Sequence, residues 1–120
     1  MEFIFDNNSP IYVQLVEQLK IHIISGKLAA GERLPSVRDL SLKLKVNPNT
    51  LQRALSELEE MGIIFTERTN GKFVTEDTAL LEKLKIEYAD TICKKFFENM
   101  MSIGFNEEKA VDYLEKTKGE

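Results

Sequence analysis

The sequence predicts a mainly α-helical protein with a small β-hairpin. We expect a winged helix-turn-helix domain over residues 1–76 and a two-helix dimerisation segment over residues 77–120. Helix-spaced apolar residues with capping residues mark three helices before residue 62, and two β-prone stretches follow at 63–67 and 72–75. The order helix, helix, tight turn, helix, hairpin is typical of a helix-turn-helix with a trailing wing.

Length and composition indicate one small core with an appendage. The chain has 120 residues, of which 42% are hydrophobic, so it carries enough apolar surface to fold. Its apolar runs are all shorter than the roughly 18 residues that span a bilayer, and the opening MEFIFD contains two acids and no base. A single cysteine, Cys93, cannot form an internal disulfide, which favours the cytoplasm.

The first helix is predicted to start at Ser9 and Pro10 and to stop at Gly26. Ser9 is a suitable N-cap, and proline fits the first helical position because no backbone N–H is needed there. Glycine tolerates the left-handed conformation that ends many helices. The expected apolar face consists of Ile11, Leu15, Leu19 and Ile23.

Two short helices should follow a loop over residues 27–35, which has a short extended piece at Arg33 and Leu34. Ser36 is the expected N-cap of the first, with Asp39 at the N3 position of a capping-box-like arrangement in which Asp replaces the usual Glu or Gln. Its apolar residues are Val37, Leu40 and Leu44. The second opens with Asn47 as N-cap and Pro48 at N1, closes at Gly62, and has the apolar stripe Leu51, Ala54, Leu55, Leu58 and Met61.

After the hairpin, whose turn is expected at residues 68–71, the pattern changes. Apolar residues recur mostly every four positions from about Asp77 to Gly104, which predicts a long amphipathic helix. Asn106 is a suitable cap for a last helix with Ala110, Val111 and Leu114 on its apolar face. We expect the long helix to pair with a second copy through Leu81, Leu84, Tyr88, Ile92, Phe96 and Met100. The alternative is that both helices pack on their own winged domain.

The charge distribution is uneven. The formal net charge is −4, yet the segment from 27 to 53 is basic. Its bases are Lys27, Arg33, Arg38, Lys43, Lys45 and Arg53, and its acids are Glu32 and Asp39. A local basic surface on an acidic protein is expected where that surface meets phosphate. The alternative is chance clustering on a solvated surface.

The helix that starts at Asn47 has the residues of a DNA recognition helix. Small polar and basic side chains occupy its N-terminal end: Asn47, Asn49, Thr50, Gln52 and Arg53. We expect Gln52 and Asn49 to contact bases, because amides bond bidentately to adenine. Taken singly, Asn47 and Thr50 are as well explained by capping, and Arg53 by solvation.

Phosphate contacts are expected around this helix. The N–H groups at the helix start of Ser36 can point at a phosphate, with Arg38 beside them at a phosphate or a base edge. Arg38 is equally compatible with a solvated surface position. Arg33, in the loop, and Lys72, in the wing, are expected to hold the flanking backbone.

Three stretches resemble the GntR family of bacterial repressors. They are residues 10–14 (PIYVQ), 31–40 (GERLPSVRDL) and 46–55 (VNPNTLQRAL), and the opening and short tail are similar to its YtrA-type subfamily. The resemblance implies that positions commonly touching DNA fall on Arg33, Arg38, Asn47, Asn49, Thr50 and Gln52, with Gly71 at the wing tip. The wing departs from the family pattern at Thr69, which replaces a glycine, and Leu55 replaces a frequent tyrosine.

We therefore expect a sequence-specific transcriptional regulator, a repressor that binds a palindromic operator on double-stranded DNA as a homodimer. The alternative is a winged-helix protein-interaction module without DNA binding. An enzyme is not expected: His22 is interpreted as a structural or surface residue, Cys93 as a buried thiol, and no glycine-rich phosphate loop is present. We expect no metal, no cofactor and no membrane contact, and the sequence identifies no small-molecule effector.

Overall fold

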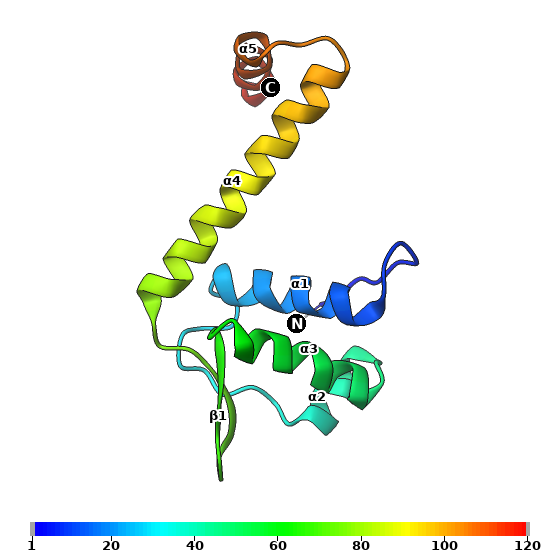
Figure 1. Ribbon diagram of the computed structural model, residues 1–120, viewed down its shortest axis with the longest axis vertical. Helices are drawn as coiled ribbons and strands as arrows, with labels where there is room; N and C mark the ends of the chain where they lie inside the picture. The colour runs from blue at the N-terminus through cyan, green and yellow to red at the C-terminus, as the bar shows by residue number, and fades with distance from the viewer. Residues whose placement is uncertain (1, 120) are drawn as a thin grey trace. The chain divides into compact units, whose positions relative to one another are not determined.

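The computed structural model describes residues 2–119 and divides the chain into two compact units, one ending at Lys83 and the other starting at Leu84. The two compact units meet within the long helix, and the predicted division of the chain into a DNA-binding domain and a dimerisation segment at residue 76 stays a prediction. The elements in chain order are α1 (Ile11–Ile24), α2 (Val37–Leu44), α3 (Pro48–Glu60), β1 (Ile64–Glu67), β2 (Gly71–Val74), α4 (Thr78–Ser102) and α5 (Glu107–Lys118) (Figure 1). The mainly helical fold with one hairpin is confirmed.

The start of α1 differs from the prediction. Pro10 is the N-cap, with an extended ψ of 145°, and no side chain caps the helix. The Ser9 carbonyl instead accepts a hydrogen bond of 2.7 Å from the side-chain amide of Gln14. Leu15, Leu19 and Ile23 are buried as predicted and Val16 is buried beside them, whereas Ile11, the first residue of the helix, is 38% exposed. Gly26 ends the segment at φ 84°, as predicted.

The two helices of the helix-turn-helix begin as predicted. Ser36 Oγ accepts from the Asp39 N–H at 3.1 Å, and Asn47 Oδ1 accepts from the Asn49 N–H at 2.8 Å. The turn between them is tight because Lys45 adopts a left-handed conformation with φ 58°. Two hydrogen-bonded caps and this turn fix how α3 leaves α2.

The core of the first unit lies where α3 packs against α1 and α2 (Figure 1). Its largest fully buried side chains are Leu15, Leu19, Ile23, Leu40, Leu51, Leu55, Leu58, Ile63, Ile64 and Val74. Met61, predicted to belong to this stripe, is 40% exposed because it is the C-cap of α3 and no longer on the helix. One side of α3 is therefore buried in the core, and its other side is exposed and available to a ligand.

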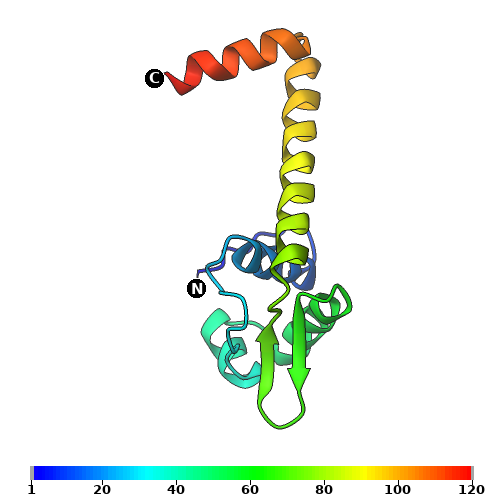
Figure 2. The same cartoon turned by 90° about the vertical axis from the view of Figure 1, so that its left-hand side faces the viewer.

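The wing is an antiparallel hairpin in which Ile64 pairs with Val74 and Thr66 with Lys72 (Figure 2). The loop before α2 adds a third, short extended piece, as predicted. Leu34 N–H donates to the Lys72 carbonyl and Val74 N–H to the Glu32 carbonyl, both at 2.8 Å. Strand β2 thus has hydrogen-bonded neighbours on both sides, which ties the wing to the start of α2.

The second unit consists of most of α4 and all of α5. Gly104, at φ 99°, lies in the turn between them, and Asn106 caps α5 by accepting from the Lys109 N–H at 2.8 Å, as predicted. Ala110 is fully buried, but Val111 and Leu114, predicted on the same face, are exposed. An edge-to-face aromatic contact joins Phe105, in the turn, to Tyr113 on α5.

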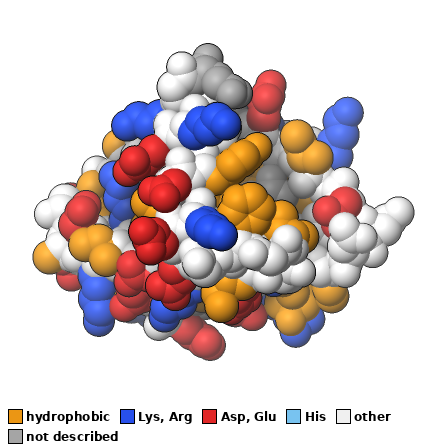
Figure 3. All heavy atoms as spheres, turned by 90° about the horizontal axis from the view of Figure 1, so that it is seen from above, with side chains coloured by type: hydrophobic (Ala, Val, Ile, Leu, Met, Phe, Trp, Pro, Cys, Tyr) orange, Lys and Arg blue, Asp and Glu red, His pale blue; other side chains and the backbone are white. Residues whose placement is uncertain are grey.

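Helix α4 has no buried residue in the single chain. The prediction of a buried thiol at Cys93 is wrong: the side chain is exposed, because within residues 2–119 no other element covers that part of the helix. Uncovered hydrophobic side chains are visible at the molecular surface (Figure 3). Within residues 2–119, no helix is long and apolar enough to cross a membrane.

Candidate nucleic-acid interface

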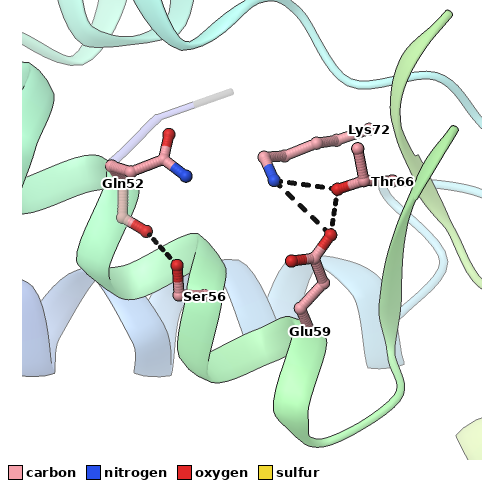
Figure 4. Close-up of polar contacts among 5 residues, drawn as sticks. All are labelled: Gln52, Ser56, Glu59, Thr66 and Lys72. Carbon is pink, nitrogen blue, oxygen red and sulfur yellow. Dashed lines mark hydrogen bonds and ion pairs between the residues drawn. The ribbon is translucent and has the colours of Figure 1, made fainter. Parts of the chain in front are cut away.

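The N-terminal half of α3 presents an unobstructed polar surface. Asn49, Gln52 and Arg53 are exposed, and Thr50 is half-buried. The side-chain amide of Gln52 extends away from the helix, and its backbone carbonyl accepts from Ser56 Oγ at 2.9 Å (Figure 4). Asn47 is exposed as well, but its side-chain oxygen is already used by the cap. Amide and guanidinium groups in this position suit bidentate contacts with base edges.

Arg53 is not a freely solvated side chain. Its guanidinium carbon lies 3.6 Å from the centroid of the Tyr12 ring at the start of α1. A guanidinium stacked on an aromatic ring keeps the N–H groups at its edge available to an acceptor. The stack therefore orients Arg53 without consuming its donors.

The start of α2 contributes a second polar surface. Ser36 and Arg38 are both exposed, and the first N–H groups of a helix lack intrahelical acceptors. Such a helix start attracts phosphate. Asp39, also exposed in the first turn, opposes an anion there. The net attraction at this helix start therefore depends on the arginines around it.

A groove separates the start of α2 from the wing. Arg33, Ser36, Val37, Arg68 and Gly71 are among the residues that line it. Arg33 lies along the wing: a Cβ built on Gly71 would be 3.6 Å from its Nε and 3.7 Å from its Nη2. Gly71 has φ 100°, a left-handed conformation that glycine adopts without strain. Two arginines thus border a groove of a size that a phosphate backbone could enter.

Lys72 has protein partners, unlike the expectation of a lysine held ready for phosphate. Its Nζ lies 3.4 Å from Glu59 Oε1 and donates to Thr66 Oγ1 at 2.9 Å, and its side chain is only 17% exposed (Figure 4). The charge of this lysine is balanced within the protein. The phosphate contact of Lys72 stays a prediction, because its ammonium group already binds Glu59 and Thr66.

Three contributors were missed by the sequence analysis. Tyr12 and Glu59 act on Arg53 and Lys72 across long sequence distances, so no local pattern reveals them. Arg68 lies exposed in the wing turn. The sequence shows it as a basic residue in the expected turn of the wing, a position from which a side chain can reach the DNA backbone.

His22 makes structural contacts. The His22 ring stacks on Phe3 with 4.8 Å between centroids, and its Nδ1 lies 2.7 Å from the Gln18 carbonyl oxygen. Among the described residues, no three histidines, cysteines or acids are grouped as metal ligands would be. The exposed amide and guanidinium groups of this surface are suited to binding.

The residues predicted to form a dimer interface lie on α4. Five of them are half-buried in the single chain: Leu81, Leu84, Tyr88, Phe96 and Met100. Ile92 is 55% exposed. Leu81 belongs to the first compact unit and the other five to the second. Their stripe is thus incompletely covered by the chain itself.

One side of α3 is buried in the core, and its exposed N-terminal amides lie beside a basic groove and a wing. This arrangement is that of a winged helix-turn-helix DNA-binding transcription regulator. Residues 11–74 match the family described as bacterial regulatory proteins, gntR family. The chain belongs to this family, whose members are transcription regulators.

Individual proteins similar to this chain are also transcription regulators. The transcriptional regulator YhcF of Bacillus subtilis is 34% identical over 108 residues, which are 90% of this chain and 89% of YhcF. The transcriptional repressor YtrA of the same organism is 41% identical over 78 residues, 63% of this chain and 60% of YtrA. The structure of a GntR family regulator from Listeria monocytogenes superposes with a TM-score of 0.87 at 43% identity, covering 93% of this chain and 98% of that one.

Proposed function

We propose that this regulator is a repressor that binds a palindromic operator as a homodimer, with α3 in the major groove. The observation that carries the proposal is the division of α3 into two sides. Leu51, Leu55 and Leu58 are fully buried, while Asn49 and Gln52 project into solvent. A helix fixed so firmly on one side can hold its outer amides in register with base edges.

In the proposed complex, Gln52 and Asn49 contact bases and Arg53 contacts a base edge or the adjoining phosphate. Arg33, Arg38 and the helix start at Ser36 bind the backbone beside the groove. Asn47 and Thr50 hold the start of α3 and touch the backbone. Gly71, at φ 100°, sets the backbone conformation of the wing where it would approach the DNA.

The dimer would form through the stripe on α4, from Leu84 to Met100. This proposal is supported by the exposure of α4, which has no buried residue in the single chain. Exposed apolar surface of this kind favours pairing with a second copy. Repression is supported by the relative YtrA, which is a repressor. Since the target is chromosomal DNA, the proposed site of action is the cytoplasm.

The direct test is selection of bound sequences from random duplex DNA, carried out with the unaltered chain and with Gln52→Ala. We expect an inverted repeat for the unaltered chain. Gln52→Ala should relax preference at one position of each half-site, at a cost of about 1–3 kcal/mol. Gln18→Ala, which alters a glutamine on α1 that bonds to Ile4, is the matched control and should leave the selected sequence unchanged. An unaltered profile in Gln52→Ala would contradict the placement of α3.

A further inference from the structure

Three polar side chains join the wing to the last turn of α3. Glu59 lies on α3, Thr66 on β1 and Lys72 on β2. The Thr66 hydroxyl donates to the Glu59 carboxylate, and Lys72 Nζ contacts both of the others (Figure 4). We call this triangle the wing clamp. Each of its members contacts the other two, so the hairpin and the helix are linked through a closed set of contacts.

The register explains why the clamp forms. Thr66 and Lys72 are paired across the hairpin and therefore lie on the same side of it. Ile64 and Val74, the next pair on that side towards the core, are buried against the domain. The clamp extends this attachment by one residue pair, from an apolar base to a polar outer end.

A hairpin with four residues in each strand is marginally stable alone, so its outer half needs support. The apolar base holds the inner pair, and the hydrogen bond from Leu34 N–H to the Lys72 carbonyl ties β2 to the loop before α2. The opposite side of the hairpin carries the stacked rings of Phe65 and Phe73, which contact each other at 5.6 Å. The tie from the outer half of the hairpin to α3 is therefore the carboxylate of Glu59.

We propose that Glu59 is a positioning residue that fixes the position of the wing relative to the recognition helix α3. In this proposal Lys72 belongs to the wing clamp and does not contact phosphate. The proposal rests on the proposed DNA binding, because its purpose is to let wing and α3 meet one duplex together. The free basic groups of the wing region, Arg33 and Arg68, then bind the backbone.

The first experiment needs no DNA. Amide hydrogen exchange of β1 and β2 is measured in Glu59→Gln, Lys72→Met and the double variant, with Glu60→Gln as control for loss of one carboxylate from the same turn. Glu59→Gln and Lys72→Met should each accelerate exchange near Thr66 several-fold. The double variant should add little to either, because each change opens the same clamp. Unchanged exchange in both single variants would overturn the clamp.

The second experiment is a titration of the selected operator over a range of salt concentrations. Glu59→Gln should bind about 3–10-fold more weakly than Glu60→Gln, since both lose one negative charge and only the first frees the wing. Lys72→Met should keep the slope of log affinity against log salt, whereas Arg33→Met should lower it by about 0.9 for each lost contact. Tighter binding and a steeper slope in Glu59→Gln would show that Lys72 is a phosphate ligand restrained by Glu59, and would refute the proposal. If the unaltered chain binds no duplex, the proposed function fails, while exchange still decides the clamp.

Discussion

The guanidinium of Arg53 stacks on the ring of Tyr12, 3.6 Å from its centroid. The contact connects the recognition helix α3 to the first turn of α1, two elements that also share the core. Arginine is thereby limited to few rotamers before any DNA arrives. Pre-orienting a side chain reduces the entropy lost when it binds.

We therefore expect Tyr12→Leu to weaken operator binding about 3–10-fold, in line with the 0.5–2 kcal/mol of a cation–π contact. Tyr12→Phe should bind nearly as well as the unaltered chain, because it keeps the ring. The measurement is a titration of one labelled operator, with thermal unfolding to verify that each variant is folded. Equal losses in Tyr12→Leu and Tyr12→Phe would assign the effect to the hydroxyl and exclude the stack.

Binding should depend strongly on salt despite the net charge of −4. The basic groups gather around the groove, so they release counterions locally when they meet phosphate. A dimer that contacts about 6–10 phosphates should lose roughly 10³–10⁵ in affinity between about 50 and 200 mM salt. A titration across that range measures the slope. Salt-independent binding would be incompatible with the proposed backbone contacts, and absence of duplex binding would favour a protein-interaction module.

Gly71→Ala should impair the wing through its backbone. The residue has φ 100°, where an added Cβ is strained by about 1–2 kcal/mol. The Cβ would meet Arg33 only at ordinary contact distance, so backbone strain dominates. Gly26→Ala is a matched control: it has φ 84° and open space around it, far from the wing in sequence.

Both glycine variants should lower the melting temperature by a few degrees. Only Gly71→Ala should also weaken operator binding once the folded fraction is taken into account. If Gly26→Ala weakened the operator complex equally, the effect would come from general destabilisation, and the special role of Gly71 in the wing would be wrong.

Local patterns in the sequence predicted the elements because local chemistry determines them. The caps at Ser36, Asn47 and Asn106 each satisfy a backbone donor within three residues, so they are legible in sequence. Pro10 was misassigned because a proline suits both the cap and the first helical position, and only the tether from Gln14 to Ser9 decides between them. Met61 was likewise placed on the buried stripe because the end of α3 was predicted one residue too late; it is the C-cap.

The candidate site was predictable only as a set of exposed residues on one helix and its neighbours. The partners of those residues were not predictable, since Tyr12 and Arg53, or Glu59 and Lys72, meet through tertiary packing. A sequence shows that Lys72 is basic but not that a carboxylate neutralises it. The exposure of Cys93 has a similar origin, because burial of α4 depends on what covers it and no local pattern records that.

The last prediction concerns assembly. Ile92 is 55% exposed, between Tyr88 and Phe96 on the same stripe of α4. Removing that stripe from water stabilises a pair at about 25 cal/mol per Å² of apolar area, offset in part by the cost of association. A carboxylate placed in its middle would have to be buried without a partner, so Ile92→Glu should convert a dimer to a monomer.

Lys94→Glu is the matched control, since residue 94 lies about 200° around the helix from residue 92 and its side chain is exposed. Sedimentation of the two full-length variants at several concentrations distinguishes them, with far-ultraviolet circular dichroism to verify that both remain helical.

A dimer places two copies of α3 about 34 Å apart, or a multiple of that, on one side of the duplex. Losing it removes the effective concentration that joins the two half-sites, so Ile92→Glu should bind the full operator about 10²-fold more weakly and a single half-site unchanged. A monomeric unaltered chain, or a dimer that survives Ile92→Glu, would show that α4 does not make the interface.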